Sequence, residues 1–170
     1  MPSILMVLAP ENFRDIEYIV PRAFWEQAGF NIQTSSINIQ SKGRFGYKVE
    51  IDLLIDQAKV EDFEAIFFVG GVGALDYLED ETARRLAQDF VKAGKVVGAI
   101  CAACRLLITW DLLDGRECTG HNWDNTMASL AAQHGATYSD EMVVSDGAFV
   151  TGYGPEQSEA VALAMLSQLA

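Results

Sequence analysis

Hydrophobic residues gather in short continuous runs, and segments of helical periodicity separate these runs. The runs at residues 4–9, 65–69 and 96–100 are apolar throughout, the pattern of strands buried on both faces of a parallel sheet. Residues 15–28 carry apolar side chains at helical spacing, and residues 30–39 alternate loosely between apolar and polar. The first third of the chain therefore predicts a strand, a helix and a second strand.

The rest of the chain continues this alternation. The pattern predicts a small hairpin at 43–51, helices at 80–93, 101–110 and 126–134, short strands at 117–120, 142–144 and 148–151, and a closing helix at 155–169. Repeated alternation of strands and helices favours an α/β fold with helices on both faces of the sheet. We predict a three-layer, flavodoxin-like sandwich with a mostly parallel sheet.

Size, charge and cysteine content narrow the class of protein. With 170 residues, half of them hydrophobic, the chain is expected to form one domain over residues 1–170. The formal charge of -12 disfavours binding to nucleic acids and to anionic membrane surfaces. No apolar run is long enough to span a membrane, and no basic leader precedes the first strand. Three cysteines, an odd number, favour reduced thiols and a cytoplasmic location.

The segment with the clearest chemistry places Cys101 at the junction of a buried strand and a predicted helix. Such a nucleophile elbow needs small residues two positions before and after the nucleophile, and Ala99 and Ala103 meet this requirement. The start of a helix also favours the thiolate, so the pKa of Cys101 is expected to be lowered. The alternative is that Cys101 is only a small buried core residue.

A glycine pair, Gly70 and Gly71, follows another buried strand. In an open parallel sheet, functional sites gather at the carboxyl ends of the strands. The backbone amides of Gly71 and Ala102 are therefore candidates for an oxyanion hole facing an intermediate on Cys101. A turn that needs glycine only for its dihedral angles is the alternative.

Taken together, these segments resemble the ThiJ/PfpI superfamily, which includes the parkinsonism-associated protein deglycase, bacterial glyoxalase-type chaperones and the so-called intracellular proteases. The resemblance covers nearly the whole chain and is carried by residues 4–9, 17–21, 68–71, 98–102, 112–116 and 146–155. It implies that Cys101 is the nucleophile and that Glu17, on the first helix, hydrogen-bonds the thiol. It also matches His121 to a histidine that follows the strand beyond the elbow helix.

The chemistry of a thiol beside a carboxyl agrees with the role implied for Glu17. Two negative charges in contact are costly, so the carboxyl is expected to be protonated, to donate a hydrogen bond and later to carry a proton. His121 is a candidate general acid and base. Taken without the resemblance, Glu17 also fits a solvated helix face, and His121 fits a surface or core position.

The sequence departs from the resembled family at two places. The residue after the cysteine is Ala102, where the protease and glyoxalase-chaperone branches typically have histidine, which argues against peptidase activity. The frequent Ser-Arg-Gly-Pro segment is Gly152–Pro155 here, so an arginine that could bind an anion is absent. Anionic substrates are thereby disfavoured, although Arg105 and Arg14 remain candidates to bind an anion. The candidates for the substrate pocket are Asn12, Arg14, Gly70 and Arg105.

A metal site is the main competing interpretation of the cysteines. Cys101, Cys104, Cys118 and His121 have a spacing that could supply four soft ligands. However, residues three apart on one strand point to opposite faces, and the surrounding sequence is apolar strand. We therefore expect no metal ion, and the chemistry that the resemblance implies requires no organic cofactor.

The resemblance implies a cofactor-free, cysteine-dependent enzyme that acts on small reactive carbonyl compounds, of the glyoxalase or deglycase type. The alternative is a redox-sensing or stress-protective, chaperone-like protein in which Cys101 is oxidised to a sulfinate. An amidase, a peptidase, an isonitrile hydratase or an interaction module with a vestigial site is less favoured. A homodimer is also expected, from the resemblance and from the apolar content of the first helix and of residues 44–51.

Overall fold

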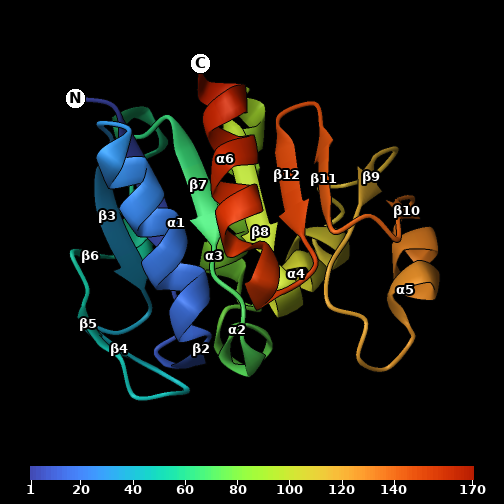
Figure 1. The fold of residues 1–170 in the computed structure, drawn as a ribbon, viewed down its shortest axis with the longest axis horizontal. Coiled ribbons are helices and arrows are strands. Elements are labelled where there is room, and N and C mark those ends of the chain that lie inside the picture. The colour runs from blue at the N-terminus through green and yellow to red at the C-terminus, as the bar shows by residue number, and fades with distance from the viewer.

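A seven-stranded sheet forms the centre of the computed structural model, which describes residues 1–170 (Figure 1). The strand order is β11-β12-β8-β7-β1-β3-β6, and every neighbouring pair is parallel except β11 and β12. The strands are β1 (Ser3–Val7), β3 (Asn31–Ser36), β6 (Leu53–Leu54), β7 (Ala65–Phe68), β8 (Val96–Ile100), β11 (Val143–Asp146) and β12 (Phe149–Gly152). The predicted mostly parallel sheet is confirmed.

Helices cover both faces of this sheet and complete the predicted three layers. Helices α1 (Asp15–Gln27) and α6 (Ser158–Leu169) lie side by side on one face, and α3 (Glu81–Lys92) and α4 (Cys104–Thr109) lie on the other (Figure 1). Trp25 joins the first layer to the sheet. Its indole Nε1 donates a hydrogen bond of 3.1 Å to the carbonyl of Ala162 in α6, and its ring packs edge-on against Phe67 of β7.

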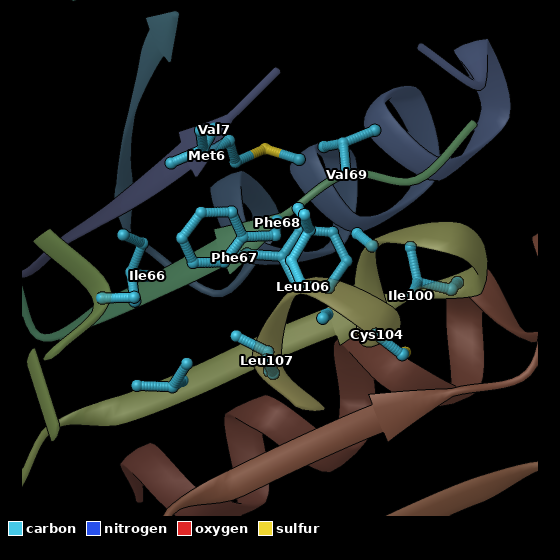
Figure 2. Packing of buried hydrophobic residues seen from close by; sticks show 14 of the residues in the cluster. Met6, Val7, Ile66, Phe67, Phe68, Val69, Ile100, Cys104, Leu106 and Leu107 are labelled. Carbon is cyan, nitrogen blue, oxygen red and sulfur yellow. The ribbon is translucent and has the colours of Figure 1, made fainter. Parts of the chain in front are cut away.

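The strands at the centre of the sheet are buried on both faces, as continuous apolar runs predict. Every residue of β7 and β8 is buried, together with four of the five in β1. Figure 2 shows how side chains from these strands pack with those of α4, including Met6, Phe68 and Leu106. This packing holds the carboxyl ends of β1, β7 and β8 in fixed positions relative to one another.

The predicted hairpin belongs to a second, smaller sheet beside the start of α1. This sheet contains β2 (Glu11–Phe13), β4 (Gln40–Gly43) and β5 (Lys48–Glu50), and a two-stranded sheet contains β9 (Glu117–Cys118) and β10 (Thr137–Tyr138). The hairpin is tied to α1 by the buried Asp15. The carboxylate of Asp15 accepts hydrogen bonds of 2.9 Å from the backbone amides of Phe45 and Tyr47.

Several element boundaries differ from those that the sequence pattern predicts. The second strand ends at Ser36 rather than at residue 39, and the closing helix α6 begins only after a 3-10 turn at Pro155–Gln157. Helix α2 (Val72–Tyr77) was not predicted, because its glycines are typical of a loop. Gly73 is needed there for a close approach, since a Cβ atom would collide with the carbonyl oxygen of Glu11.

Helix α5 (Met127–Gln133) follows the loop after β9 and matches the helix predicted at 126–134. None of the helices combines the length and the apolar character that a membrane crossing requires.

Candidate active site

Cys101 sits on a sharp turn between β8 and α4. Its φ angle is +58°, a left-handed conformation that residues other than glycine rarely adopt. A 3-10 turn at Cys101–Ala103 leads into α4, and both Ala102 and Ala103 are buried. The strand, the strained turn and the helix together have the geometry of the nucleophile elbow that the small neighbouring residues predict.

The elbow opens into a pocket of about 540 Å³ at the carboxyl ends of the strands. The pocket is lined by Arg14, Arg44, Gly71, Val72, Leu75, Asp76, Cys101, Ala102, His121, Trp123, Tyr153, Pro155 and Glu156. Cys101 is 8% exposed, whereas Cys104 and Cys118 are completely buried. Of the three thiols, only that of Cys101 is therefore open to a ligand.

Glu17 lies directly beneath the elbow, on the first turn of α1. The residue is completely buried, and neither carboxyl oxygen has a hydrogen-bond partner of normal geometry. Gly70 lies between Glu17 and the elbow. The space there is so narrow that a Cβ atom added at Gly70 would lie 2.4 Å from Glu17 Oε2 and 2.9 Å from Cys101 Cβ. The carboxyl of Glu17 and the side chain of Cys101 therefore approach each other across a residue that must be glycine.

Burial determines the protonation state of Glu17. It raises the pKa of the carboxyl from 4.5 to about 8, although the Cys101 side chain, the charge of Arg14 and the Gly70 amide all lower the pKa. The carboxyl is therefore mainly protonated at neutral pH. This is the state in which it can donate a hydrogen bond to sulfur.

The structure corrects the expectation that the pKa of the Cys101 thiol is lowered. Burial is the largest cause and the negative charge of Glu17 the next, and they raise this pKa to about 12. The amides of Ala102 and Gly71 act in the opposite direction but do not outweigh burial. The helix contribution is small because α4 has only six residues and follows a 3-10 turn. The pair of groups therefore keeps both protons below about pH 8, and above this pH one proton is shared between sulfur and carboxyl.

Two backbone amides act on the Cys101 sulfur. The amides of Ala102 and Gly71 both lower the pKa of the thiol, that of Ala102 more than that of Gly71. Gly71 has a φ angle of +100°, and a Cβ atom there would lie 2.6 Å from the backbone nitrogen of Arg14. A glycine is therefore required for the second amide to reach this position. These are the amides that the sequence nominates for an oxyanion hole.

His121 reaches the pocket from the loop that follows β9. Its backbone amide donates a hydrogen bond of 3.3 Å to the carbonyl of Cys101, so the loop is attached to the elbow itself. The imidazole ring lies 5.4 Å from the ring of Trp123 and 5.5 Å from that of Tyr153, centroid to centroid. The structure thus brings Cys101, Glu17 and His121 to one place, with Glu17 below the thiol and His121 in the pocket wall.

The four candidates for the substrate pocket divide into two groups. Arg14 lines the pocket, and Gly70 lies between Glu17 and Cys101. Asn12 is exposed in β2, where its φ angle is +59°, and does not line the pocket.

Arg105 does not line the pocket either, contrary to the sequence-based expectation. Its guanidinium group forms an ion pair of 2.6 Å with Asp124, donates a hydrogen bond to Thr126 and lies 4.0 Å from the centre of the Trp123 ring. Arg105 therefore packs behind Trp123 rather than facing a ligand.

Eight of the thirteen residues that line the pocket were not predicted from the sequence, among them Arg44, Trp123 and Tyr153. Arg44 comes from the predicted hairpin, whose position in space a sequence pattern does not give. Trp123 and Tyr153 have no motif of their own. The signal for Tyr153 was its place within Gly152–Pro155, and that for Trp123 was its distance of two residues from His121.

The spacing that suggested a metal site does not produce one in three dimensions. The structure gathers no group of three or more histidine, cysteine, aspartate or glutamate side chains in an arrangement that could hold a metal ion. Cys104 is instead directed to the carbonyl of Gly152, at a sulfur-to-oxygen distance of 3.5 Å.

The fold and the site define an α/β protein with a cysteine on a nucleophile elbow above a buried glutamic acid. The family model described as the DJ-1/PfpI family matches residues 2–168, and the chain belongs to this family. It is 32% identical to an uncharacterized protein of Methanocaldococcus jannaschii, over 98% of this chain and 82% of the relative. It is also 32% identical to the Bacillus subtilis protein named "Putative cysteine protease YraA", over 94% of each chain.

Solved structures give the same result. A ThiJ/PfpI domain protein from Brachyspira murdochii superimposes with a TM-score of 0.92 at 31% identity, over 98% of this chain and 95% of that one. DJ-1beta of Drosophila melanogaster superimposes with a TM-score of 0.88 at 24% identity, over 99% and 90% of the two chains, and this likeness concerns the fold alone.

Proposed function

We propose that this protein is a cofactor-free, cysteine-dependent enzyme that acts on small reactive carbonyl compounds, with glyoxalase or deglycase chemistry. The observation that carries the proposal is the pairing of Cys101 with a buried Glu17 that is protonated at neutral pH, at the edge of an open pocket. This pair places a nucleophile and a proton donor at the same carbonyl group.

The first step is addition of the thiol to the aldehyde group of a 2-oxoaldehyde. A bond forms between sulfur and the aldehyde carbon, and the thiol proton passes to the carbonyl oxygen, directly or by way of Glu17, which gives a hemithioacetal and leaves Glu17 protonated. The amides of Gly71 and Ala102 face the sulfur and can stabilise negative charge that develops on this oxygen. The high pKa of the free thiol is therefore no obstacle, because sulfur loses its proton as the new bond forms.

The second step moves a proton between neighbouring carbons. The imidazole of His121, or the carboxylate of Glu17 once water has taken its proton, removes the proton from the carbon that bears sulfur, and a proton is returned to the adjacent carbonyl carbon. The product is a thioester of a 2-hydroxy acid. Water then cleaves the carbon–sulfur bond, so the overall reaction adds one water molecule and releases the 2-hydroxy acid and the free thiol.

A redox function of the same cysteine is the second candidate. Oxidation of Cys101 by peroxide to a sulfinate would place its oxygens near the amides of Gly71 and Ala102 and near the Glu17 proton, all of which face the sulfur. Peptidase activity has less support, because Ala102 stands where a neighbouring histidine would form a direct dyad with the cysteine.

A panel of substrates separates these functions. Small aldehydes, glycated thiols, amides, isonitriles and a peptide are offered to the wild type, to Cys101→Ala and to Cys118→Ala, a control in which a buried thiol outside the pocket is removed. We expect the wild type and Cys118→Ala to consume only the carbonyl compounds. Hydrolysis of the peptide or amides, or oxidation of Cys101 by peroxide without turnover of any aldehyde, would contradict the proposal.

We also propose that the protein acts as a homodimer. Exposed apolar side chains on α1 and around the β4–β5 hairpin support this: Ile16, Ile39, Phe45 and Tyr47 are 46%, 70%, 69% and 47% exposed. Light scattering at micromolar concentration is expected to give twice the chain mass of 18.6 kDa, and a species of 18.6 kDa alone would contradict this expectation.

A further inference from the structure

Two arginines enter the pocket without an ionic partner. Arg14 and Arg44 both line it, and neither takes part in any of the ion pairs of the protein. The Nε atom of Arg14 is buried and has no hydrogen-bond partner. Arg44 is exposed, whereas Arg14 is half-buried, and a buried guanidinium nitrogen without a partner is unusual in a chain where carboxylates outnumber the basic side chains two to one.

The acid next to Arg14 in the sequence is already occupied. Asp15 follows Arg14 in the chain, but its two carboxylate oxygens accept hydrogen bonds from the backbone amides of Phe45 and Tyr47. These bonds hold the hairpin so that the Phe45 ring lies against both cations, with its centre 4.8 Å from the guanidinium carbon of Arg14 and 6.0 Å from that of Arg44. One aspartate thus positions the hairpin and leaves both cations unpaired.

Backbone contacts connect Arg14 to the elbow. Its amide donates a hydrogen bond of 2.9 Å to the carbonyl of Gly70, and the same nitrogen is what a Cβ atom on Gly71 would meet at 2.6 Å. The charge of Arg14 also lowers the pKa of Glu17. The guanidinium group is therefore held beside the reacting pair.

The pocket has two chemically different sides. Arg14 lies after β1 and β2, and Arg44 lies in the β4–β5 hairpin, which follows β3. Strands β1 and β3 are on one side of β8 in the sheet order, whereas Tyr153 follows β12, on the other side. The His121 ring contacts that of Tyr153, which places the histidine on the aromatic side. Cys101, at the end of β8, lies between the two sides. The acids of the pocket, Asp76 and Glu156, are exposed and form no ion pair with either arginine.

We propose that Arg14 and Arg44 bind an anionic group of the substrate, which makes the substrate class aldehydes that carry a carboxylate or a phosphate. Planar guanidinium groups bind both anions through paired hydrogen bonds. This inference rests on the proposed function, because it assumes that a carbonyl compound reacts at Cys101. It also revises the sequence-based expectation that anionic substrates are disfavoured, since arginines from other segments take the place of the one missing from Gly152–Pro155.

The size of the pocket agrees with a substrate of this kind. A volume of about 540 Å³ falls in the range of pockets that hold ligands much larger than methylglyoxal. An aldehyde with a charged substituent places its carbonyl group at Cys101 and its charge at the arginines.

The test measures binding without turnover. Iodoacetamide alkylates Cys101, the only thiol that lines the pocket, and the modified peptide is quantified by mass spectrometry. Protection of Cys101 is then compared for matched pairs of acids and neutral amides (propionate and propanamide, butyrate and butanamide) and for inorganic phosphate. The proteins are the wild type, Arg14→Gln, Arg44→Gln and Lys48→Gln. Lys48 is exposed on the same hairpin but does not line the pocket, so its variant controls for the lost charge.

We expect the anions to protect wild-type Cys101 at concentrations roughly 10- to 100-fold lower than the amides do. This preference should fall about 10-fold in Arg14→Gln and in Arg44→Gln and stay unchanged in Lys48→Gln. Comparison of the acids with phosphate shows whether the site prefers a carboxylate or a phosphate. Equal protection by acids and amides in the wild type, or an undiminished preference in both arginine variants, would overturn the inference.

The anion site and the proposed reaction can each be disproved without the other. If the enzyme turns over neutral aldehydes but the anions do not protect Cys101, the proposed function stands and the anion site is wrong. If the anions protect Cys101 through the arginines but no carbonyl compound is consumed, the site is an anion site and the proposed reaction is wrong.

Discussion

Glu17→Gln is expected to lower kcat for aldehyde turnover by at least about 100-fold, the usual contribution of a general acid and base. Glutamine keeps a donor of similar shape next to the sulfur but cannot release or accept a proton. Iodoacetamide should therefore still alkylate Cys101 in this variant while turnover is lost. Glu26→Gln, on the exposed side of the same helix, is the matched control and should keep wild-type kcat.

The wild type and Glu17→Gln should also differ in a second measurement, the pH dependence of the unfolding free energy. The pKa of Glu17 in the folded protein is about 8, above its value of 4.5 in the unfolded chain, so the folded state holds this proton more tightly. The stability contributed by the protonated carboxyl is complete below about pH 4.5 and is lost as the pH rises through 8.

Urea unfolding should therefore show that the unfolding free energy of the wild type falls relative to that of Glu17→Gln across this interval. A difference that does not change with pH would mean that Glu17 is already ionised in the folded protein. Full aldehyde turnover by Glu17→Gln would leave His121 as the proton carrier.

Gly70→Ala is expected to destabilise the protein by about 1–3 kcal/mol and to abolish turnover. The new Cβ atom would lie 2.4 Å from Glu17 Oε2, 2.5 Å from the carbonyl oxygen of Ile100 and 2.9 Å from Cys101 Cβ. Two of these atoms belong to the elbow, so relief of the collision requires the elbow itself to move. Equilibrium urea unfolding and the aldehyde assay together measure both effects.

Gly154→Ala is the control for this substitution. A Cβ atom at Gly154 would meet only the side-chain ends of Glu156 and Gln157, at 3.6 and 3.8 Å, and its φ angle of -171° is open to any residue. Its stability should stay close to that of the wild type. Equal stability and activity of Gly70→Ala and the wild type would show that Glu17 and Cys101 do not need the close approach described above.

The sequence pattern predicted the sheet well because the information is local. Continuous apolar runs mark strands that are buried on both faces, and β1, β7 and β8 are such strands. The elbow was also predictable, since small residues at 99 and 103 are a steric requirement of the turn. Helix α2 was not, because Gly73 disfavours a helix in isolation and only its close approach to Glu11 explains a glycine there.

The protonation states and the pocket wall depend on tertiary structure, which explains the errors there. The pKa of Cys101 rises because the residue and Glu17 are buried together, and no local pattern reports burial of that kind. Arg105 looked like a pocket residue but is paired with Asp124, which lies 19 residues away in sequence. Arg44 reaches the pocket only because Asp15 fixes the hairpin beside α1.

The most direct test of the account follows conversion of methylglyoxal to lactate by nuclear magnetic resonance, with the wild type and Cys101→Ala at equal concentration. Cys101 is the one thiol that lines the pocket, so its removal takes away the proposed nucleophile without changing the other two cysteines. We predict steady formation of lactate by the wild type and none above the uncatalysed rate by Cys101→Ala. Formation of lactate at the same rate by both proteins would contradict the central claim.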